Sequence, residues 1–491
     1  MKKEKGQIKS FEEGGESAGD LRTGGKPKSR LKAGLVTLGY FEYWRMYPAL
    51  KEQVESDLSV VEGHMRALDA EIVCSGMVDT LDAAHAAGEM LAARGADVLV
   101  LVCGTYVADY ISLTVLDALP HLPVIVFSVQ AHENVDRQGD YQSSLRNSGI
   151  IGVAQLTGTL RKLRREFSIV VGSVDDARAY RKIGSLLRAA AAVKSLRESN
   201  IGIIGHVFRG MYDIELSKTF LKGTFGVNLI QIQSSHLMDI WQNVSDAEAE
   251  DRAQKLLRRF ARKNVTEQDV FHAMKLAIAM QRLSEKFHLD ALCFLDQHFI
   301  QRQVKASARM GASLLMENTG MSVNCEGDIG GLVTMMLMRA IAKDAPLMAE
   351  WGEYDAAENA CLLIGHGIGT PDLAKSDGDV MLTRTPEEWG FEGAGLNYEL
   401  AMKPGPATIA HVMEGPEGYR MLITRARTLD LPRLAFDELH AWARVETPVK
   451  EYLERIFDFG VSHHCIIGAG DMAEELEYAA KLLKLKTFRI D

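Results

Sequence analysis

The chain lacks most features that mark membrane, secreted or nucleic-acid-binding proteins. No apolar run of about 20 residues occurs, so the sequence predicts no membrane span. Its first residues are charged and Gly-rich, without the apolar core of a signal peptide, and we therefore expect a cytoplasmic protein. Asp and Glu total 66 whereas Lys and Arg total 56, and this acidic balance disfavours binding to a phosphate backbone.

Paired cysteines and nucleotide-binding loops are also absent. No Cys-x-x-Cys pair occurs, which excludes a zinc ribbon and a thioredoxin motif. No G-x-x-x-x-G-K-[ST] loop is present, and "GIIGHVFRG" lacks the GxGxxG spacing, so a nucleotide-dependent enzyme is disfavoured. Four cysteines lie in apolar stretches, as expected of reduced, buried thiols: Cys74, Cys103, Cys293 and Cys361.

A length of 491 residues predicts about three domains. Residues 1–32 have few apolar side chains, and we interpret them as a flexible tail or an arm on a neighbouring subunit. Residues 33–172 and 173–345 alternate apolar runs with helical stretches, which predicts two doubly wound, Rossmann-like parallel α/β domains. Short β-like segments in residues 346–491, separated by turns such as "SDGD", predict a mainly antiparallel β-barrel domain with helices.

Polar side chains at strand ends or adjoining loops of the two α/β domains are candidate ligand contacts. Ligands of such sheets bind at the carboxyl ends of the strands, and hydroxyl-bearing ligands need polar groups there. A surface or second-layer role for His298 is equally compatible with the pattern. The candidates are Tyr106, Gln130, Asp296, Gln297 and His298.

The stretch "VNCEGDIGGLVTMMLMRAI" sets two carboxylates, Glu326 and Asp328, against an apolar helix-like run. Acidic side chains stabilise the positive end of a helix, so either could be a cap. Alternatively, Glu326 belongs to a site completed by residues further along the chain. Glu350 in "AEWGEYD" and His366 in "LLIGHG" are candidates, because carboxylates and imidazoles together suit a divalent ion such as Mn²⁺.

The segment "GVSHHC" contains two further histidines, His463 and His464. Neighbouring side chains of an extended segment face opposite sides, so we expect at most one to reach a given site. A structural role for either histidine is the common alternative.

These segments, in this order, resemble the L-arabinose isomerases and the related L-fucose isomerases. "CEGD" is similar to their "AEGD" region, "AEWGEYD" to the region of a second acidic ligand, "LLIGHG" to that of a first histidine ligand, and "SHHC" to their "HHT" segment. The resemblance implies a metal site for Mn²⁺ or another divalent cation, with four ligands: Glu326, Glu350, His366 and His464.

The resemblance also implies an activity and an assembly. The activity is isomerisation of a free aldose to a ketose through a cis-enediol(ate), with Glu326 and Glu350 as the acid–base pair. The assembly is a homo-oligomer in which the first domain of one subunit covers the metal site of another.

The chain departs from the family pattern in its first domain. It has "CGTYVAD" where the family has an "HTFSP"-like stretch with an active-site histidine, so the sugar is left open. An epimerase or another enolising enzyme would use the same acid–base pair. A sugar-binding sensor without catalysis is the alternative from a different class.

Overall fold

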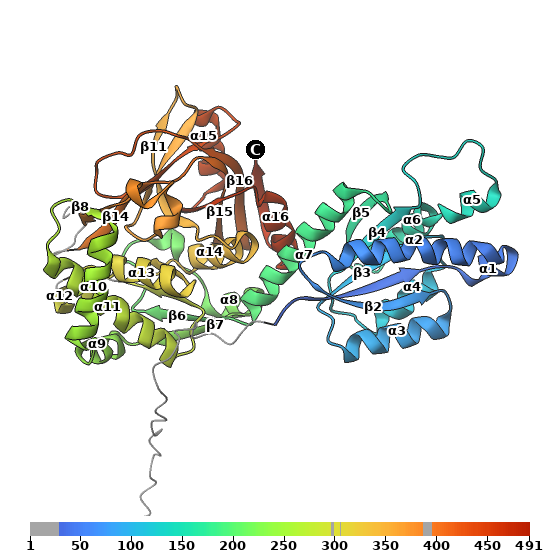
Figure 1. Ribbon diagram of the computed structural model, residues 1–491, viewed down its shortest axis with the longest axis horizontal. Coiled ribbons are helices and arrows are strands. Elements are labelled where there is room, and N and C mark those ends of the chain that lie inside the picture. The colour runs from blue at the N-terminus through green and yellow to red at the C-terminus, as the bar shows by residue number, and fades with distance from the viewer. Residues whose placement is uncertain (1–28, 296–298, 305, 386–394) are drawn as a thin grey trace, which may run out of the picture.

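The computed structural model describes residues 29–295, 299–304, 306–385 and 395–491 (Figure 1). The predicted tail therefore lies almost wholly outside the described residues. The remainder forms two lobes, with α7 (Ala177–Arg197) running between them. α7 contacts β5 in one lobe and both α14 and α16 in the other, and its buried residues belong to one apolar cluster that continues through both lobes.

The N-terminal lobe is built on a five-stranded parallel sheet in the order β2-β1-β3-β4-β5. Its central strand is an unbroken apolar run, "VLVLVC", because both of its faces are covered. The strands are β1 (Lys32–Leu38), β2 (Glu71–Val78), β3 (Val98–Cys103), β4 (Val124–Gln130) and β5 (Ser168–Ser173).

Helices cover both faces of this sheet. Leu35 and Val100 belong to one buried apolar cluster with residues of α2 and α7, whereas Val36 and Leu101 belong to a second cluster with residues of α3, α4 and α6. The predicted α/β sandwich of this lobe is therefore confirmed. Its helices are α1 (Phe41–Met46), α2 (Pro48–Arg66), α3 (Leu81–Ala93), α4 (Asp109–Asp117), α5 (Tyr141–Arg146) and α6 (Gly149–Lys162).

A second parallel sheet, with the order β10-β9-β6-β7, lies in the other lobe and confirms the second α/β prediction. Its strands are β6 (Asn200–Ile204), β7 (Asn228–Ile232), β9 (Ala291–Phe294) and β10 (Ser322–Cys325). The accompanying helices are η1 (Tyr212–Ile214), α8 (Lys218–Phe225), α9 (Ser234–Gln242), α10 (Asp246–Arg259), α11 (Glu267–Lys286), α12 (Phe299–Val304), α13 (Arg309–Thr319) and α14 (Ile329–Ala342).

The third sheet is a ten-stranded mixed sheet in the order β19-β16-β15-β18-β11-β12-β17-β14-β13-β8. Most pairs are antiparallel, as predicted, but β8–β13, β14–β17 and β16–β19 are parallel. Its strands are β8 (Ala261–Arg262), β11 (Leu347–Asp355), β12 (Ala360–Gly365), β13 (Met381–Arg384), β14 (Leu396–Ala401), β15 (Gly405–Gly415), β16 (Gly418–Thr428), β17 (Leu439–Arg444), β18 (His464–Ala469) and β19 (Lys486–Ile490).

The predicted barrel stays a prediction, because the strands are described best as one large mixed sheet. One short additional pairing bears on whether the sheet closes into a barrel. β16 also pairs with β17 through Arg427↔Arg444 and Thr428↔Ala443. The domain limits at 172/173 and 345/346 likewise stay predictions. The remaining helices are η2 (Pro371–Leu373), η3 (Asp377–Asp379), α15 (Val449–Phe459) and α16 (Ala473–Leu482).

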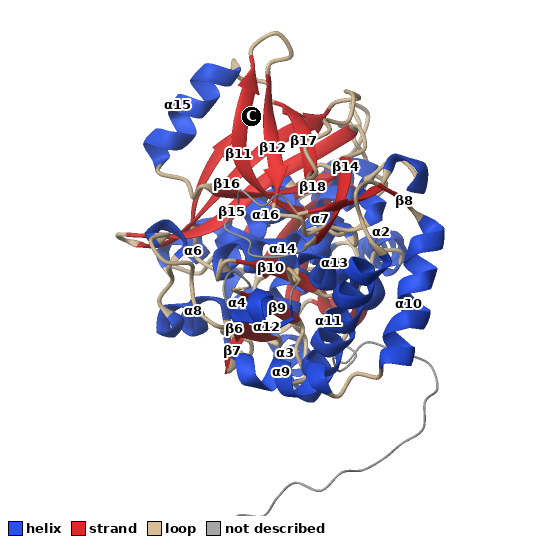
Figure 2. Ribbon diagram, turned by 90° about the vertical axis from the view of Figure 1, so that its left-hand side faces the viewer, coloured by secondary structure: helices blue, strands red, loops and turns tan. Residues whose placement is uncertain are grey.

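Helix α14 joins the second parallel sheet to the mixed sheet. It begins just after β10 and contacts β15 and β18 of the mixed sheet. Figure 2 shows the strands of the mixed sheet above α14 and β10. The carboxyl end of β10 therefore lies beside the strands that carry the other candidate site residues.

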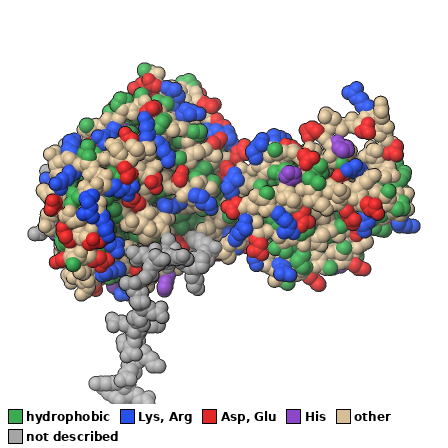
Figure 3. Space-filling model, in the orientation of Figure 1, with side chains coloured by type: hydrophobic (Ala, Val, Ile, Leu, Met, Phe, Trp, Pro, Cys, Tyr) green, Lys and Arg blue, Asp and Glu red, His purple; other side chains and the backbone are tan. Residues whose placement is uncertain are grey.

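The surface carries both signs of charge. On the face shown in Figure 3, basic and acidic side chains are interspersed over both lobes. Such a surface produces no extended field of one sign on this face. Among the described helices, none combines the length and the apolar character needed to cross a lipid bilayer.

The close approach of α14 to β15 gives a stability prediction. A Cβ atom at Gly330, which is buried near the start of α14, would collide with the Val412 carbonyl oxygen. Overpacking of this kind costs about 1–3 kcal/mol, and we expect Gly330→Ala to lower the free energy of unfolding by that amount in urea denaturation.

Gly63 is the matched control for this variant. It lies in the exposed part of α2, and a Cβ there meets no atom within 4 Å. Gly63→Ala should leave stability unchanged or raise it by up to ~1 kcal/mol, since Ala favours helices over Gly. Equal stability of Gly330→Ala and the wild type would contradict the packing argument.

Candidate metal and acid–base site

Glu326 lies in a strained turn between β10 and α14. Its φ is 63° and that of Gly327 is 82°, so two consecutive residues adopt left-handed backbone conformations. A non-Gly residue there costs of the order of 1 kcal/mol and needs support from its surroundings. That support includes the Phe208 amide, which donates to the Glu326 carbonyl oxygen at 3.0 Å.

Asp328, and not Glu326, caps α14. Its carboxylate accepts a hydrogen bond from the Gly331 amide at 2.7 Å, as an N-cap side chain does. The sequence left both a capping role and a site role open for these two carboxylates. The structure assigns the cap to Asp328 and leaves the Glu326 side chain to face the histidines.

The four predicted metal ligands come together in space. His366 Nε2 lies 3.3 Å from Glu350 Oε1 and 3.9 Å from Glu326 Oε2, and His464 Nε2 lies 3.3 Å from Glu326 Oε2. Strand register explains much of this, because Glu350 on β11 pairs directly with His464 on β18. His366 follows the end of the neighbouring strand β12.

The four side chains differ in exposure. Glu326, His366 and His464 are buried, whereas 38% of the Glu350 side chain is exposed. Glu350 therefore lies on the solvent side of the cluster. A small molecule arriving from solvent meets this carboxylate before the three buried groups.

Mutual contacts within the cluster keep both carboxylates ionised. Burial alone would raise the pKa of Glu326, but His464 and His366 outweigh it and hold the pKa at about 2. The hydrogen bond with His366 lowers the pKa of Glu350. Both carboxylates therefore carry negative charge at neutral pH, as a metal ligand or a general base requires.

The pKa values of the two imidazoles, His366 and His464, shift in opposite directions. Burial lowers the pKa of His366 despite its contact with Glu350. Burial would also lower the pKa of His464, but Asp328 and Glu326 outweigh it and raise that pKa to about 9. The surrounding carboxylates thus stabilise a positive charge at His464, and a divalent ion bound to its Nε2 would displace the proton.

The donor set suits a divalent metal ion. Ligand atoms of Glu350, His366 and His464 all lie within 4.8 Å of one another, which is close enough for one ion to contact all three. Carboxylate oxygen and imidazole nitrogen form a mixed set accepted by first-row divalent ions. The geometry therefore fits a metal centre.

Asp328 also orients the His464 ring, through a contact with its Nδ1 atom. Its Oδ2 lies 3.1 Å from His464 Nδ1 and 3.0 Å from His411 Nε2, and all three side chains are buried. A carboxylate on Nδ1 directs Nε2 of the same ring outward, as in many carboxylate–histidine–metal arrangements. His411 was not recognised from the sequence, although it lies in "KPGPATIAHV", because nothing local links it to Asp328.

The position of His463 differs from the expectation for this pair of histidines. We expected at most one histidine of the pair to reach the site, but ring nitrogens of His463 and His464 lie with a Glu326 oxygen in one group within 4.8 Å. The alternation of a strand does not apply, because β18 begins only at His464 and His463 lies in a bend. Asp213, also unrecognised in the sequence, contacts His463 Nδ1 at 2.6 Å.

Of the predicted substrate contacts that the structure describes, neither Tyr106 nor Gln130 joins this cluster within one chain. Tyr106 and Gln130 lie at the carboxyl ends of β3 and β4, in the lobe on the far side of α7 (Figure 1). Tyr106 packs edge-on against Tyr40, with ring centroids 5.3 Å apart. The other three predicted contacts lie outside the described residues: Asp296, Gln297 and His298.

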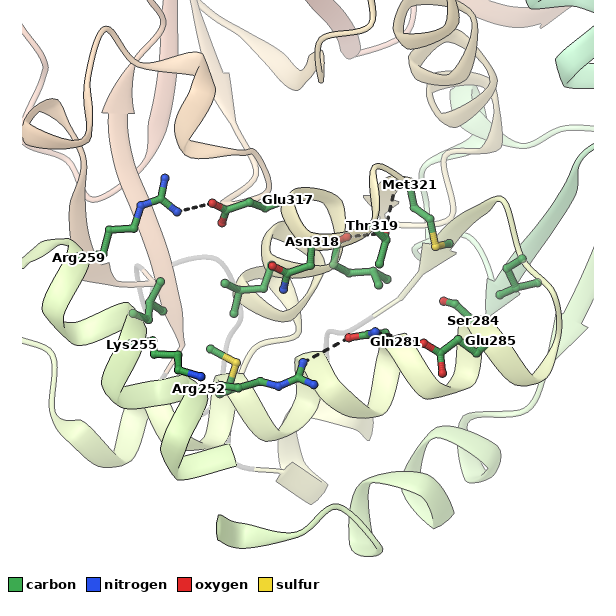
Figure 4. A pocket seen from close by; sticks show the side chains of 15 residues that line it. Arg252, Lys255, Arg259, Gln281, Ser284, Glu285, Glu317, Asn318, Thr319 and Met321 are labelled. Carbon is green, nitrogen blue, oxygen red and sulfur yellow. Dashed lines mark hydrogen bonds and ion pairs between the residues drawn. The ribbon is translucent and has the colours of Figure 1, made fainter. Parts of the chain in front are cut away.

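A cavity of about 380 Å³ lies elsewhere, among α10, α11 and α13 (Figure 4). Arg252 and Arg259 line it, but they pair with Gln281 and Glu317 in the same wall. None of the four predicted metal ligands lines it. We therefore do not assign this cavity to the candidate metal site.

Comparison with known proteins places the chain among relatives of the sugar isomerases. No family model matches it. It is 26% identical to a sulfoquinovose isomerase of Alkalicoccus urumqiensis, covering 75% of this chain and 81% of that protein. It is 23% identical to the sulfoquinovose isomerase of Priestia aryabhattai, covering 74% of this chain and 79% of that protein.

The particular relationship is arabinose-isomerase-like, as predicted. An L-arabinose isomerase of Klebsiella pneumoniae is 20% identical, covering 67% of this chain and 68% of that protein. The predicted remote relationship to the arabinose isomerases is thereby confirmed.

The raised pKa of His464 predicts a pH-dependent stability. The folded pKa of about 9 exceeds the ordinary value of 6.5, so this stabilisation is complete below pH 6.5 and declines as pH rises through 9. With a chelator present, we expect wild-type unfolding free energy to fall by roughly 1–2 kcal/mol more than that of His464→Gln between pH 7 and 8.5.

Urea denaturation at the two pH values measures this difference. The exposed His121 provides the control, because His121→Gln should keep the wild-type pH dependence. If His464→Gln loses as much stability over this interval as the wild type, His464 does not hold the proposed proton.

Proposed function

We propose that the protein is a metal-dependent aldose–ketose isomerase acting on a free sugar through a cis-enediol(ate). The convergence of Glu326, Glu350, His366 and His464 is the observation that carries this proposal. The relationship to sugar isomerases supports the reaction class. A non-catalytic sugar sensor has no need for two ionised carboxylates beside two histidines.

Glu326, Glu350, His366 and His464 would hold the ion, which we propose to be Mn²⁺. Oxygen and nitrogen donors together suit such an ion better than they suit Cu(I), which prefers sulfur. When bound, a divalent ion polarises the sugar oxygens and stabilises negative charge on them as a Lewis acid. The protein supplies ionised carboxylates and holds His464 in place through Asp328.

The two carboxylates would move the proton. One accepts the proton from C2 of the open-chain aldose, and a proton is returned to C1, while a hydroxyl proton passes from O2 to O1. Glu350 is the more exposed carboxylate, and Glu326 is held more deeply by the strained turn. Both are ionised at neutral pH, so either can start the reaction as the base.

Sugars named for the relatives are the first substrates to examine. The more similar relatives are sulfoquinovose isomerases and the more distant ones are L-arabinose isomerases. Recognition of the rest of the sugar would differ between these substrates, whereas the transfer between C1 and C2 would not. We therefore propose the common reaction and leave the sugar to a substrate panel.

We also propose a homo-oligomer with the active site at the subunit interface. Tyr106 and Gln130 lie in the opposite lobe from the metal cluster, so they can act as substrate contacts only on a neighbouring subunit. The exposed side chains of Tyr110 and Tyr141 in the same lobe would suit such a contact.

The first test removes each carboxylate charge. Glu326→Gln and Glu350→Gln should each slow exchange of the C2 proton with D₂O, followed by NMR, by about 10²–10⁴-fold, because positioned acid–base groups contribute that much. Glu353→Gln, an exposed residue of the same strand as Glu350, is the control and should retain full activity. Wild-type exchange rates in both site variants would refute the proposal.

The second test concerns the assembly. We expect light scattering to give a mass of at least twice the 54.2 kDa of the chain. Tyr106→Ala should lower kcat/KM by about tenfold while leaving bound metal unchanged, because it would remove a contact made across the interface. An active monomer would exclude the proposed arrangement.

A further inference from the structure

The cavity of about 380 Å³ among α10, α11 and α13, here called the α13 cavity, has the size and composition of a small-molecule site (Figure 4). Such sites enclose about 300–1,000 Å³ and combine apolar walls with a few polar groups. An apolar floor open to solvent costs free energy, which a ligand with an apolar body recovers. The buried apolar side chains of the floor are Leu256, Met274, Leu289, Leu314 and Leu315.

Basic side chains of α10 form one wall of the α13 cavity. Arg252, Lys255 and Arg259 all line it. Residues three and four positions apart share one face of a helix, so α10 turns a positive stripe toward the cavity. Glu285 and Glu317 are the carboxylates among the described wall residues. This wall thus carries an excess of positive charge, although the net charge of the chain is −10.

The carboxylates that pair with Arg252 and Lys255 lie outside the cavity wall. Arg252 pairs with Glu248 at 3.0 Å and Lys255 with Asp251 at 2.6 Å, each four residues earlier on α10. Within the cavity, the Arg252 guanidinium is directed toward a neutral amide, that of Gln281, whose Oε1 accepts at 3.3 Å (Figure 4). Ion pairs of this helical spacing are weak, so a bound anion can engage both cations at little cost.

The two wall carboxylates do little to repel such an anion. Glu317 pairs with Arg259, which also pairs with Asp377 at 2.7 Å. Glu285 is exposed, so water screens its charge, and its Oε1 accepts from Gln281 Nε2 at 3.1 Å. The positive part of the cavity is therefore the α10 wall around Arg252 and Lys255.

α13 separates this cavity from the candidate metal ligands. Leu314 and Leu315 of α13 line the cavity. The adjacent Ser313 contacts the loop that follows His366, because its hydroxyl accepts from the Gly369 amide at 3.1 Å. A molecule in the cavity would thus lie apart from the proposed sugar site, and its binding does not depend on the proposed reaction.

We propose that the α13 cavity binds a small soluble organic anion with an apolar body and one anionic group. The apolar body lies against the leucines of the floor, and the anionic group contacts Arg252 and Lys255. Charge-assisted hydrogen bonds from a guanidinium are directional, so they fix how the molecule lies in the cavity. The site is a second binding function of the chain, in addition to the one proposed for the metal cluster.

The experiment uses anilinonaphthalene sulfonate, a probe that joins an aromatic body to one sulfonate. Its binding to the folded full-length protein is measured by fluorescence and by calorimetry. The neutral phenylnaphthylamine has the same aromatic body without the sulfonate. We expect the sulfonate to bind saturably, and the neutral probe to bind about tenfold more weakly, because it lacks the charged contact.

Arg252→Gln tests the charge requirement. It should weaken binding of the sulfonate by about tenfold and leave binding of the neutral probe within about twofold of the wild type, because only the charged contact is lost. The matched control is Arg258→Gln. Arg258 is an exposed residue of the same helix outside the described cavity wall, so its loss should change neither affinity.

Ser284→Leu tests the location. Ser284 is buried in the cavity wall, where its hydroxyl donates to the Met280 carbonyl oxygen at 2.9 Å. A leucine there occupies part of the cavity and should weaken both probes by about tenfold or more. Ser59→Leu is the matched control, because the exposed Ser59 donates in the same way to the Glu55 carbonyl oxygen at 2.8 Å in the other lobe.

Melting temperatures establish that each variant is folded, and the Arg252→Gln comparison decides if Ser284→Leu does not fold. Equal affinity of Arg252→Gln and the wild type for the sulfonate would overturn the anion assignment. Unchanged binding in folded Ser284→Leu, or no saturable binding to the wild type, would overturn the site. Glu326→Gln should bind both probes as the wild type does, and loss of binding there would place the probe at the metal cluster and overturn the inference. A failed isomerase assay would refute the proposed reaction alone.

Discussion

The site depends on the carboxylate of Asp328. This fully buried group caps α14 through the Gly331 amide and contacts His464 and His411 on two strands of the mixed sheet. It therefore joins the second parallel sheet, a helix and the mixed sheet at one point. With the helix start capped in this way, the neighbouring Glu326 is available to contact His366 and His464. Burying a charge at such a junction is tolerable because each oxygen is hydrogen-bonded.

Charge balance explains why the cluster suits a cation. Three carboxylates, Glu326, Glu350 and Asp328, lie around two imidazoles. Asp328 and Glu326 raise the pKa of His464, while the histidines lower the pKa values of the three carboxylates. The buried groups thus favour added positive charge, as a proton or as a divalent ion. An enolising enzyme needs the same balance, because negative charge develops on the substrate during proton transfer.

The candidate metal ligands and two of the predicted substrate contacts, Tyr106 and Gln130, lie in different lobes. The candidate metal ligands lie where β10 and α14 meet the mixed sheet, whereas Tyr106 and its aromatic neighbours Tyr40 and Tyr43 lie at strand ends of the N-terminal sheet. The sequence departs from the arabinose-isomerase pattern in "CGTYVAD", the segment that contains Tyr106. In the proposed arrangement, substrate choice can therefore vary in one lobe without disturbing the proposed metal ligands in the other.

The sequence by itself determined the parallel α/β character of the first two sheets, because continuous apolar strands such as "VLVLVC" require helices on both faces. Through the resemblance, it also indicated four separated side chains as one metal site. It could not choose between Glu326 and Asp328 as the helix cap, nor find the contacts that His411 and Asp213 make with distant residues. Those contacts join residues 83 to 250 positions apart, and only the tertiary structure brings such distant segments within hydrogen-bonding distance.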